Sequence, residues 1–292
     1  RNAFRLMRLK DKLGDWANAS SEVEFCGAWA QRVGEEGRGV ATIIGMVMMT
    51  RLDCMLGAAA EMRMALAQAL HHARHRHTFG QRLCDHALMT NVLADLAVES
   101  EAATSFALRV ARAVDQAAHD PQQAAFARIA TAIGKYWVCK RAAVFVNEAQ
   151  ECLGGAGYVE ESMLPRLYRQ APLNSIWEGS GNIQCLDVLR ALGREPQALA
   201  AVEDELDSAQ GRDARYDTSL QWLRAQLVQV PVESQARVLC ERLALQLQAA
   251  VLLRAQSPVA SAFVRSRLGG EHGMAFGTLP ADIDHAAIMQ RA

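Results

Sequence analysis

One carboxylate in this chain lies among residues that suit proton transfer. Glu178 follows two bulky apolar residues, Ile176 and Trp177, and precedes a glycine-containing turn that extends to Asn182. Apolar neighbours take a carboxyl group out of water and raise its pKa towards neutrality, which general-base catalysis at cellular pH requires. The pattern makes Glu178 a candidate general base.

The same residues have a structural explanation. Ser175 and Glu178 are three positions apart. This is the spacing of a capping box, in which a serine caps a helix and a glutamate reaches back to the N–H of the capping residue. The spacing alone favours the capping box over catalysis. Both interpretations stay open, and the context of the segment must decide between them.

Two upstream segments carry residues that could contact a ligand. Gly154 and Gly155 follow a long helical pattern that ends near Glu151, and paired glycines both end helices and let the backbone approach a ligand closely. Further upstream, Arg76 and Phe79 belong to a cationic helix end that carries one aromatic ring. Each segment alone is more simply explained as a helix end and a loop, because cations also complement the helix dipole there.

In this order and spacing, the three segments resemble the C-terminal half of the acyl-CoA dehydrogenase family. The family's motifs are an Arg-x-x-Phe-Gly turn, a Gly-Gly-x-Gly turn and an aromatic-Glu-Gly-Thr/Ser element, matched here from Arg76, Gly154 and Trp177. The resemblance is specific from about Leu9 to Gly193. The glycine-rich segments are most similar to the AidB-like branch, which is associated with the response to DNA alkylation.

The resemblance implies a mainly α-helical fold. Residues 1–34 would be a remnant of the family's middle β-domain, residues 35–194 its C-terminal four-helix up-down bundle, and residues 195–292 an extra helical tail of the AidB-like type. The chain begins at Arg1 without an initiator methionine, and the N-terminal helical domain of the family is not represented. We therefore expect a fragment that does not form a complete redox site alone.

Apolar periodicity supports the helical bundle. It predicts long helices from about residue 35 to the basic turn, from 86 to 119 and from 121 to 153, with a fourth beginning near Asn182. Short connections between such rods force antiparallel packing. Methionines recur along the first rod, and we expect them to form adaptable core. They are Met46, Met48, Met49, Met55, Met62 and Met64.

The implied activity is that of an FAD-dependent acyl-CoA dehydrogenase. In the family a glutamate removes the α-proton of an acyl-CoA thioester while flavin N5 accepts the β-hydride, and Glu178 matches that base. The resemblance also implies a homodimer or homotetramer, because some residues reach the FAD of a neighbouring subunit; the electron acceptor stays open. The residues assigned to the cofactor in this way are Arg76, Thr78, Phe79, His86, Glu151, Gly154, Gly155, Trp177, Ser180 and Asn182.

Two of these positions depart from the family pattern. The chain has His86 followed by Ala87 where most of the family has glutamine beside a histidine, and Glu151 where glutamine often precedes the paired glycines. The first change removes an amide hydrogen bond, and the second places an anion near the expected path of the dinucleotide. The resemblance also places Arg51 near the acyl pocket, although an Arg51 and Asp53 pair is more often structural.

Composition narrows the class of protein. A formal net charge of −1 gives no global attraction to nucleic acid or to a membrane, and seven scattered cysteines without a C-x-x-C pair favour reduced thiols. The longest apolar stretch, Gly39–Met49, is too short to span a bilayer, and no signal peptide is visible, so we expect a cytoplasmic protein. His71 and His75 have the spacing of a helical metal clip, but no third ligand is evident, so no metal site is predicted.

The tail supplies an alternative function. In the AidB-like branch the corresponding tail is linked to binding of double-stranded DNA. Residues 195–292 contain nine arginines, no lysine and twelve acidic residues, a formal net charge of −3 that does not support DNA binding. A local stripe of Arg237, Arg242, Arg254, Arg265 and Arg267 is conceivable. The alternative is thus a DNA- or partner-binding alkylation-response flavoprotein with weak or vestigial dehydrogenase activity. The final stretch, 269–292, is expected to be partly disordered.

Overall fold

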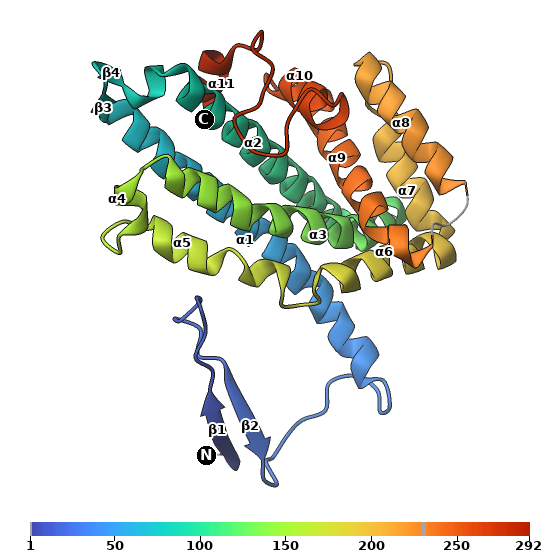
Figure 1. Ribbon diagram of the computed structural model, residues 1–292. Helices are drawn as coiled ribbons and strands as arrows, with labels where there is room; N and C mark the ends of the chain where they lie inside the picture. The colour runs from blue at the N-terminus through green and yellow to red at the C-terminus, as the bar shows by residue number, and fades with distance from the viewer. Residues whose placement is uncertain (1, 229–231) are drawn as a thin grey trace.

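The computed structural model describes residues 2–228 and 232–292 and is mainly α-helical (Figure 1). Arg1 and residues 229–231, which fall in the first and third predicted domains, lie outside the described residues. In chain order the elements are β1 (Phe4–Leu9), β2 (Ser21–Phe25), α1 (Gly39–His75), β3 (His77–Thr78), β4 (Gln81–Arg82), η1 (Leu83–Asp85), α2 (Ala87–Gln116), α3 (Pro121–Glu151), α4 (Gly155–Tyr158), α5 (Leu164–Gln170), η2 (Leu173–Ser175), α6 (Gly181–Arg194), α7 (Pro196–Asp207), α8 (Ala214–Leu227), η3 (Glu233–Gln235), α9 (Ala236–Arg254), α10 (Ala260–Phe263), η4 (Val264–Leu268) and α11 (His285–Arg291).

The centre of the molecule is a set of three long helices, α1, α2 and α3, which all pack against one another. Their bounds agree with the three long helices predicted from apolar periodicity. The start of α3 could be predicted from the sequence because Pro121 occupies its first turn. In the structure, the Asp120 carboxylate accepts hydrogen bonds from the backbone N–H groups of Gln122 and Gln123. The fourth predicted rod, α6, is shorter and packs against α3, while α9 lies against both α2 and α3.

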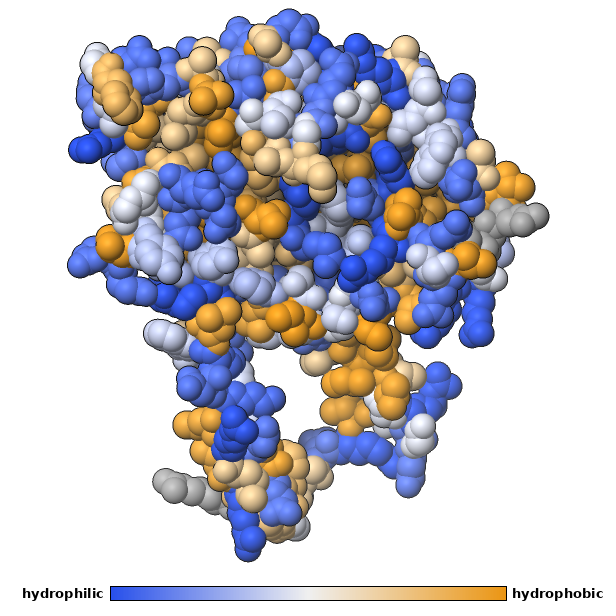
Figure 2. Space-filling view, in the orientation of Figure 1, coloured by the Kyte–Doolittle hydropathy of each residue, from blue (hydrophilic) through white to orange (hydrophobic). Residues whose placement is uncertain are grey.

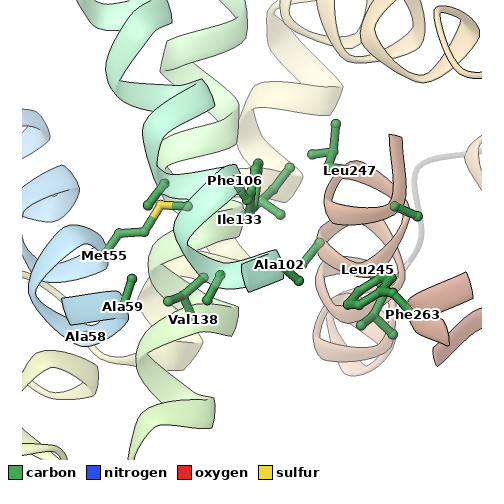
Figure 3. Close-up of a cluster of buried hydrophobic side chains, with 14 of the residues drawn as sticks. Met55, Ala58, Ala59, Ala102, Phe106, Ile133, Val138, Leu245, Leu247 and Phe263 are labelled. Carbon is green, nitrogen blue, oxygen red and sulfur yellow. The ribbon is translucent and has the colours of Figure 1, made fainter. Parts of the chain in front are cut away.

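Small residues let these helices approach closely. Ala58 and Ala59 of α1 and Ala102 of α2 are buried in the cluster drawn in Figure 3, beside the larger Phe106 and Ile133. Alanine leaves room for neighbouring side chains to interlock, and such packing at interior density holds the rods in one arrangement.

The methionine prediction for α1 is only partly correct. Met55 and Met62 are fully buried, but Met46, Met49 and Met64 are exposed. Met46 and Met49 are exposed because the first part of α1, up to about Met49, projects beyond the helices that cover the rest of it (Figure 1). Met64 lies in the covered part but on the outward face of the helix, next to the exposed Arg63. An exposed methionine has no core to adapt to.

The projecting part of α1 and the β1–β2 hairpin extend beyond the compact body of the molecule. Figure 2 shows mainly apolar residues on the projecting part of α1 and a mixture of apolar and hydrophilic residues on the hairpin. Among the described residues, α1 is the one helix long and apolar enough to cross a membrane by length and composition, and a third of its most apolar window (33%) is buried inside the molecule. Core helices of globular proteins meet the same two criteria, and the second half of α1 is such a core helix.

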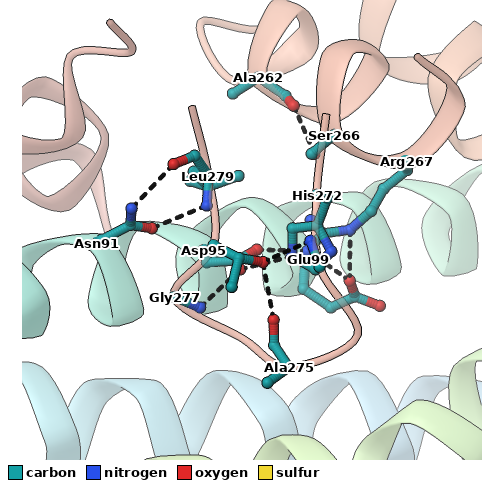
Figure 4. Close-up of polar contacts among 12 residues, drawn as sticks. Asn91, Asp95, Glu99, Ala262, Ser266, Arg267, His272, Ala275, Gly277 and Leu279 are labelled. Carbon is teal, nitrogen blue, oxygen red and sulfur yellow. Dashed lines mark hydrogen bonds and ion pairs between the residues drawn. The ribbon is translucent and has the colours of Figure 1, made fainter. Parts of the chain in front are cut away.

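A buried ionic cluster ties the end of the chain to α2 (Figure 4). Asp95, which is fully buried, accepts from Arg267 Nη2 at 2.6 Å and from the backbone N–H of Gly277 at 2.8 Å, and lies 2.8 Å from His272 Nε2. Arg267 also binds Glu99 at 2.9 Å. The prediction of partial disorder after residue 268 is therefore wrong, because these buried acids on α2 require partners that the final segment supplies.

Opposing effects set the protonation of this cluster. Burial acts to raise the pKa of Asp95, but the hydrogen bond of His272 and the charge of Arg267 outweigh it and hold this pKa below its usual value. For Glu99, burial is likewise outweighed by the charges of Arg141 and Arg267, so its pKa is also lowered. Both carboxylates are therefore ionised in the folded protein.

Asp95→Asn should lower the free energy of unfolding at pH 7 by about 3 kcal/mol, because it leaves a buried guanidinium without its full set of partners. A pKa lowered by folding stabilises the fold above the unfolded value, here 3.8, and this contribution is lost as the pH falls through the folded value. The difference between variant and parent in urea unfolding should therefore shrink below pH 4. Asp85→Asn, which removes a surface ion pair with Arg82, is the control and should change stability little. An equal loss in both variants would contradict the assignment.

Candidate active site

Glu178 lies on a sharp turn between η2 and α6. Its backbone adopts a left-handed conformation with a φ of 57°, followed by Gly179 with a φ of 95°. A non-glycine residue reaches this region at a cost, and it persists only where surrounding contacts enforce it. At Gly179 a side chain would meet Gln184 and Ile183 at 2.8–3.0 Å. The glycine after the glutamate is thus required by both conformation and space.

The carboxylate of Glu178 points towards α1 and is half-buried. Its Oε2 accepts a hydrogen bond of 2.8 Å from Thr50 Oγ1. The Ser175 hydroxyl instead donates to Pro172 O at 2.9 Å, and the Ser175 N–H also bonds to Pro172 O. Neither half of the capping box forms, so this interpretation of the spacing is wrong. The carboxylate is left at the edge of the buried part of α1, where a ligand could reach it.

The backbone of the turn is held from three helices. Arg51 Nε of α1 donates to Glu178 O at 3.1 Å. Gln184 Nε2 of α6 donates to the carbonyls of Glu178 at 3.1 Å and Gly179 at 2.9 Å. Lys135 Nζ of α3 donates to the carbonyls of Trp177 at 2.7 Å and Gly179 at 2.6 Å. The motif search missed Thr50 and Lys135, because both are remote in sequence and lie on ordinary helical patterns. It also missed Gln184, which lies only six residues after Glu178 but outside the motif.

Arg51 has a different ionic partner from the one the sequence suggested. Its Nη1 lies 2.8 Å from Asp187 on α6 rather than pairing with Asp53, and Arg128 of α3 binds the same carboxylate at 2.8 Å. Arg51 and Asp187 are both buried, so removing one charge would leave the other without compensation. Sequence proximity misled here because residues two apart on a helix face different directions.

Ser180 and Asn182 stand at the start of α6. In the described part of the chain, the Ser180 side chain makes no capping hydrogen bond and is exposed. At Gly181 a side chain would come within 3.4–3.5 Å of Tyr136 and Lys140, so the backbone there lies close to α3. Free N–H groups at a helix start bind anions such as phosphate. Asn182 Oδ1 already accepts from Arg237 Nε of α9 at 3.0 Å, a tail contact that the sequence did not predict.

The paired glycines form a compact turn after α3. Gly154 has a φ of 59° and precedes the short helix α4. The third glycine, Gly157, is the tightest, because a side chain there would meet the carbonyl oxygen of Gln150 at 2.2 Å. Gln150 Nε2 in turn donates to Gly157 O at 2.8 Å. Glu151 is exposed and accepts from Asn147 at 3.3 Å.

The remaining predicted cofactor residues surround the β3–β4 turn. Phe79 is 99% exposed with a φ of 49°, and its ring meets that of His86 edge-on at 6.3 Å. His86 Nε2 lies 3.2 Å from Thr78 Oγ1, and the Arg76 backbone N–H closes α1 by bonding to His72 O. The Phe79 ring contributes nothing to the core of this chain and is available to contact a ligand or another chain.

The predicted residues form two groups at separate places. Thr50, which binds Glu178, and His75, at the end of α1, are separated by about 38 Å of helix at about 1.5 Å per residue. Figure 1 shows the β3–β4 turn at the upper left and the loop between α5 and α6 at the lower side of the helical body, above the hairpin. One dinucleotide cannot touch both groups of a single chain.

A buried polar chain lies behind the turn. Trp177 Nε1 donates to Asn174 Oδ1 at 3.1 Å, and Asn174 Nδ2 lies 3.4 Å from Glu61 Oε1 on α1. Among the described residues, the buried Oε2 of Glu61 has no hydrogen-bond partner. Burial, with a smaller contribution from the negative charge of Asp15, raises the pKa of Glu61 to about 7.

The histidines do not assemble a cation site in the described part of the chain. The rings of His71 and His75 lie 4.4 Å apart, and His75 Nδ1 is 2.8 Å from His71 O. No group of three or more His, Cys, Asp or Glu side chains among the residues described is arranged to hold a metal ion.

The tail arginines are mostly engaged within the chain. Arg237 binds Asn182, Arg254 binds Glu205, Arg265 binds Glu271 and Asp282, and Arg267 binds Asp95 and Glu99. Three of the five arginines that could have formed a stripe are thus paired with carboxylates, and Arg237 is held by a neutral amide. The structure therefore adds no support for a cationic DNA-binding surface.

A helical bundle with a carboxylate on a glycine-flanked turn defines the class of protein. Residues 37–193 match the family model described as acyl-CoA dehydrogenase, C-terminal domain, and this chain belongs to that family. AidB of Escherichia coli (strain K12) is 45% identical over 275 residues, which cover 94% of this chain and 50% of AidB.

Solved structures agree with this assignment. Caenorhabditis elegans ACDH-11, in complex with C11-CoA, is 28% identical and superposes with a TM-score of 0.82 over 92% of this chain and 50% of that one. A Bacillus anthracis acyl-CoA dehydrogenase complexed with FAD shares the fold, with a TM-score of 0.70 at 17% identity, and covers 90% of this chain and 52% of that one. The chain thus spans about half the length of these relatives.

The buried, partly unsatisfied carboxyl group of Glu61 leads to a prediction about stability. A carboxyl whose pKa is raised by folding costs stability as the pH rises from its unfolded value, here 4.5, to its folded value of about 7. Glu61→Gln should therefore raise the free energy of unfolding by about 2 kcal/mol at pH 8 and change it little below pH 5.

Urea unfolding of parent and variant across this pH range measures the effect. Glu24→Gln, on the exposed face of the hairpin, is the matched control and should show no pH-dependent difference. A Glu61→Gln variant that is less stable at pH 8 would show that the carboxylate has a compensating partner.

Proposed function

We propose that this protein acts as an FAD-dependent acyl-CoA dehydrogenase-type oxidoreductase with Glu178 as its general base. The observation that carries the proposal is the position of the Glu178 carboxylate, which is half-buried, held by Thr50 and fixed on a strained turn whose backbone three helices support. A base placed in one orientation at the edge of the core meets the geometric requirement for removing a weakly acidic proton.

In the proposed step the protein would take a proton from the substrate and the cofactor would take a hydride. A carboxylate oxygen of Glu178 takes the α-proton of an acyl-CoA thioester, which breaks the α C–H bond. FAD, when bound, would accept the β-hydride and so become reduced as the α,β double bond forms. The growing negative charge on the thioester oxygen needs hydrogen-bond donors, and the backbone N–H of Glu178 itself is one candidate. Thr50 keeps the other carboxylate oxygen in place.

The residues present fit a dinucleotide. Ser180 and the first N–H groups of α6 offer hydrogen-bond donors to a pyrophosphate, with Lys140 beside Gly181. Arg76, Thr78, Phe79 and His86 would hold the same cofactor from a second copy of the chain, because they lie too far from Glu178 to share one within a single copy. We therefore propose a homodimer or a dimer of dimers.

The relatives support the substrate class. ACDH-11, which is 28% identical, is solved with C11-CoA, and the Bacillus anthracis acyl-CoA dehydrogenase is solved with FAD. We therefore propose an acyl-CoA thioester as substrate and FAD as cofactor of this protein.

Glu178→Gln in the flavin-loaded protein should reduce acyl-CoA-dependent bleaching of the flavin by roughly 10²–10⁴-fold, because the amide cannot accept the proton and a positioned base contributes about that factor. Flavin content, measured from the visible spectrum, should stay at the parent level. Glu161→Gln, on an exposed residue outside the turn, should bleach at the parent rate. Bleaching that survives Glu178→Gln would assign the proton transfer to another group.

A further inference from the structure

The base turn depends on a buried lysine from a different helix. Lys135 is 1% exposed, yet its ammonium donates to the carbonyls on both sides of Glu178, at 2.7 Å to Trp177 O and 2.6 Å to Gly179 O. Within the described part of the chain, no carboxylate lies within ion-pair distance of this ammonium. Its charge is thus committed to two peptide carbonyls of the turn.

Burying a lysine ammonium group lowers the stability of the fold unless its contacts compensate for the lost hydration. Transfer of an ammonium group into the interior is unfavourable unless strong hydrogen bonds replace its hydration, and here burial lowers the pKa of Lys135. An apolar side chain of similar length, such as methionine, would fill the same space without that cost. The feature that methionine cannot supply is a charged donor to two carbonyls at once, and charge-assisted hydrogen bonds are the strong ones.

The two carbonyls explain why the turn keeps its shape. With Glu178 in the left-handed region, its neighbours' carbonyl oxygens are directed inward, where they need donors. Lys135 joins the residues on either side of the strained position. Arg51 binds the carbonyl of Glu178 itself, and Gln184 binds the carbonyls of Glu178 and Gly179 but not that of Trp177. This arrangement leaves the Glu178 side chain directed towards Thr50.

We propose that Lys135 is a positioning residue that holds the Trp177–Gly179 backbone so that the Glu178 carboxylate is presented to substrate. The inference rests on the proposed function for its kinetic consequence, but its structural consequence is independent of it. Without the ammonium, the turn relaxes towards the more common right-handed or extended conformations, and the carboxylate moves away from Thr50. Lys135 itself contacts neither substrate nor cofactor in this proposal.

The test uses Lys135→Met in the protein loaded with flavin. A displacement of about 1 Å can cost roughly 100-fold in rate, so flavin reduction by acyl-CoA should slow by about that factor. Flavin content and the dissociation constant for acyl-CoA should stay at parent values. The kinetic isotope effect with α-deuterated substrate should increase, because proton removal becomes more strongly rate-limiting. A loss of global stability alone would not produce this combination.

A second measurement does not depend on activity. Amide hydrogen exchange of residues 176–182 should accelerate in Lys135→Met without any ligand, while exchange in the α1–α3 core stays protected. Thr131→Val, which removes a buried hydroxyl one turn earlier on α3 and away from the base turn, is the matched control. It should leave exchange and reduction rate unchanged. If Lys135→Met fails to fold, Lys135→Gln keeps an amide donor in the same cavity and should show the same changes at smaller amplitude.

The outcomes separate the two proposals. Flavin reduction within about twofold of the parent, with unchanged exchange at the turn, would overturn the role of Lys135 even if Glu178→Gln is inactive. Bleaching that persists in Glu178→Gln would overturn the proposed base, and faster exchange at the turn in Lys135→Met would then still establish the lysine as its support.

Discussion

Peptide carbonyls that a strained turn directs into the core must find hydrogen-bond donors, and this constraint organises the candidate site. Three consecutive carbonyls, from Trp177 to Gly179, are bound by side chains of α1, α3 and α6. Each donor sits on a helix that the alanine-lined core holds in register. The orientation of one carboxylate therefore depends on the packing of the whole bundle.

Two buried carboxylates are likewise satisfied by partners from other segments of the chain. Asp187 receives two arginines from α1 and α3, and Asp95 receives Arg267 and His272 from the end of the chain. In each case the acid lies on one helix and its partners come from segments distant in sequence. Buried ion pairs contribute little net stability compared with apolar packing, but breaking one is expensive, so they specify which segments must meet. They attach the tail to the bundle and α6 to the site.

Much of the fold could be predicted from the sequence, and less of the site. Proline at 121 after Asp120 and the apolar periodicity located the long helices closely, because these signals are local. The capping box that the Ser175 spacing alone favoured does not form, and the final segment expected to be partly disordered is ordered, since both outcomes depend on partners supplied by other parts of the chain. The sequence did not single out Lys135, because a lysine in an alanine-rich helix resembles a solvated position.

By itself the sequence determined the helical class, the family and the identity of the candidate base, because periodicity and short motifs are properties of neighbouring residues. Only the tertiary structure decided which way Glu178 faces, which donors hold its turn, and that the β3–β4 turn lies some 38 Å of helix from it. The physical reason is that hydrogen bonds and buried charges are satisfied across space, between groups whose separation along the chain carries no information about their distance.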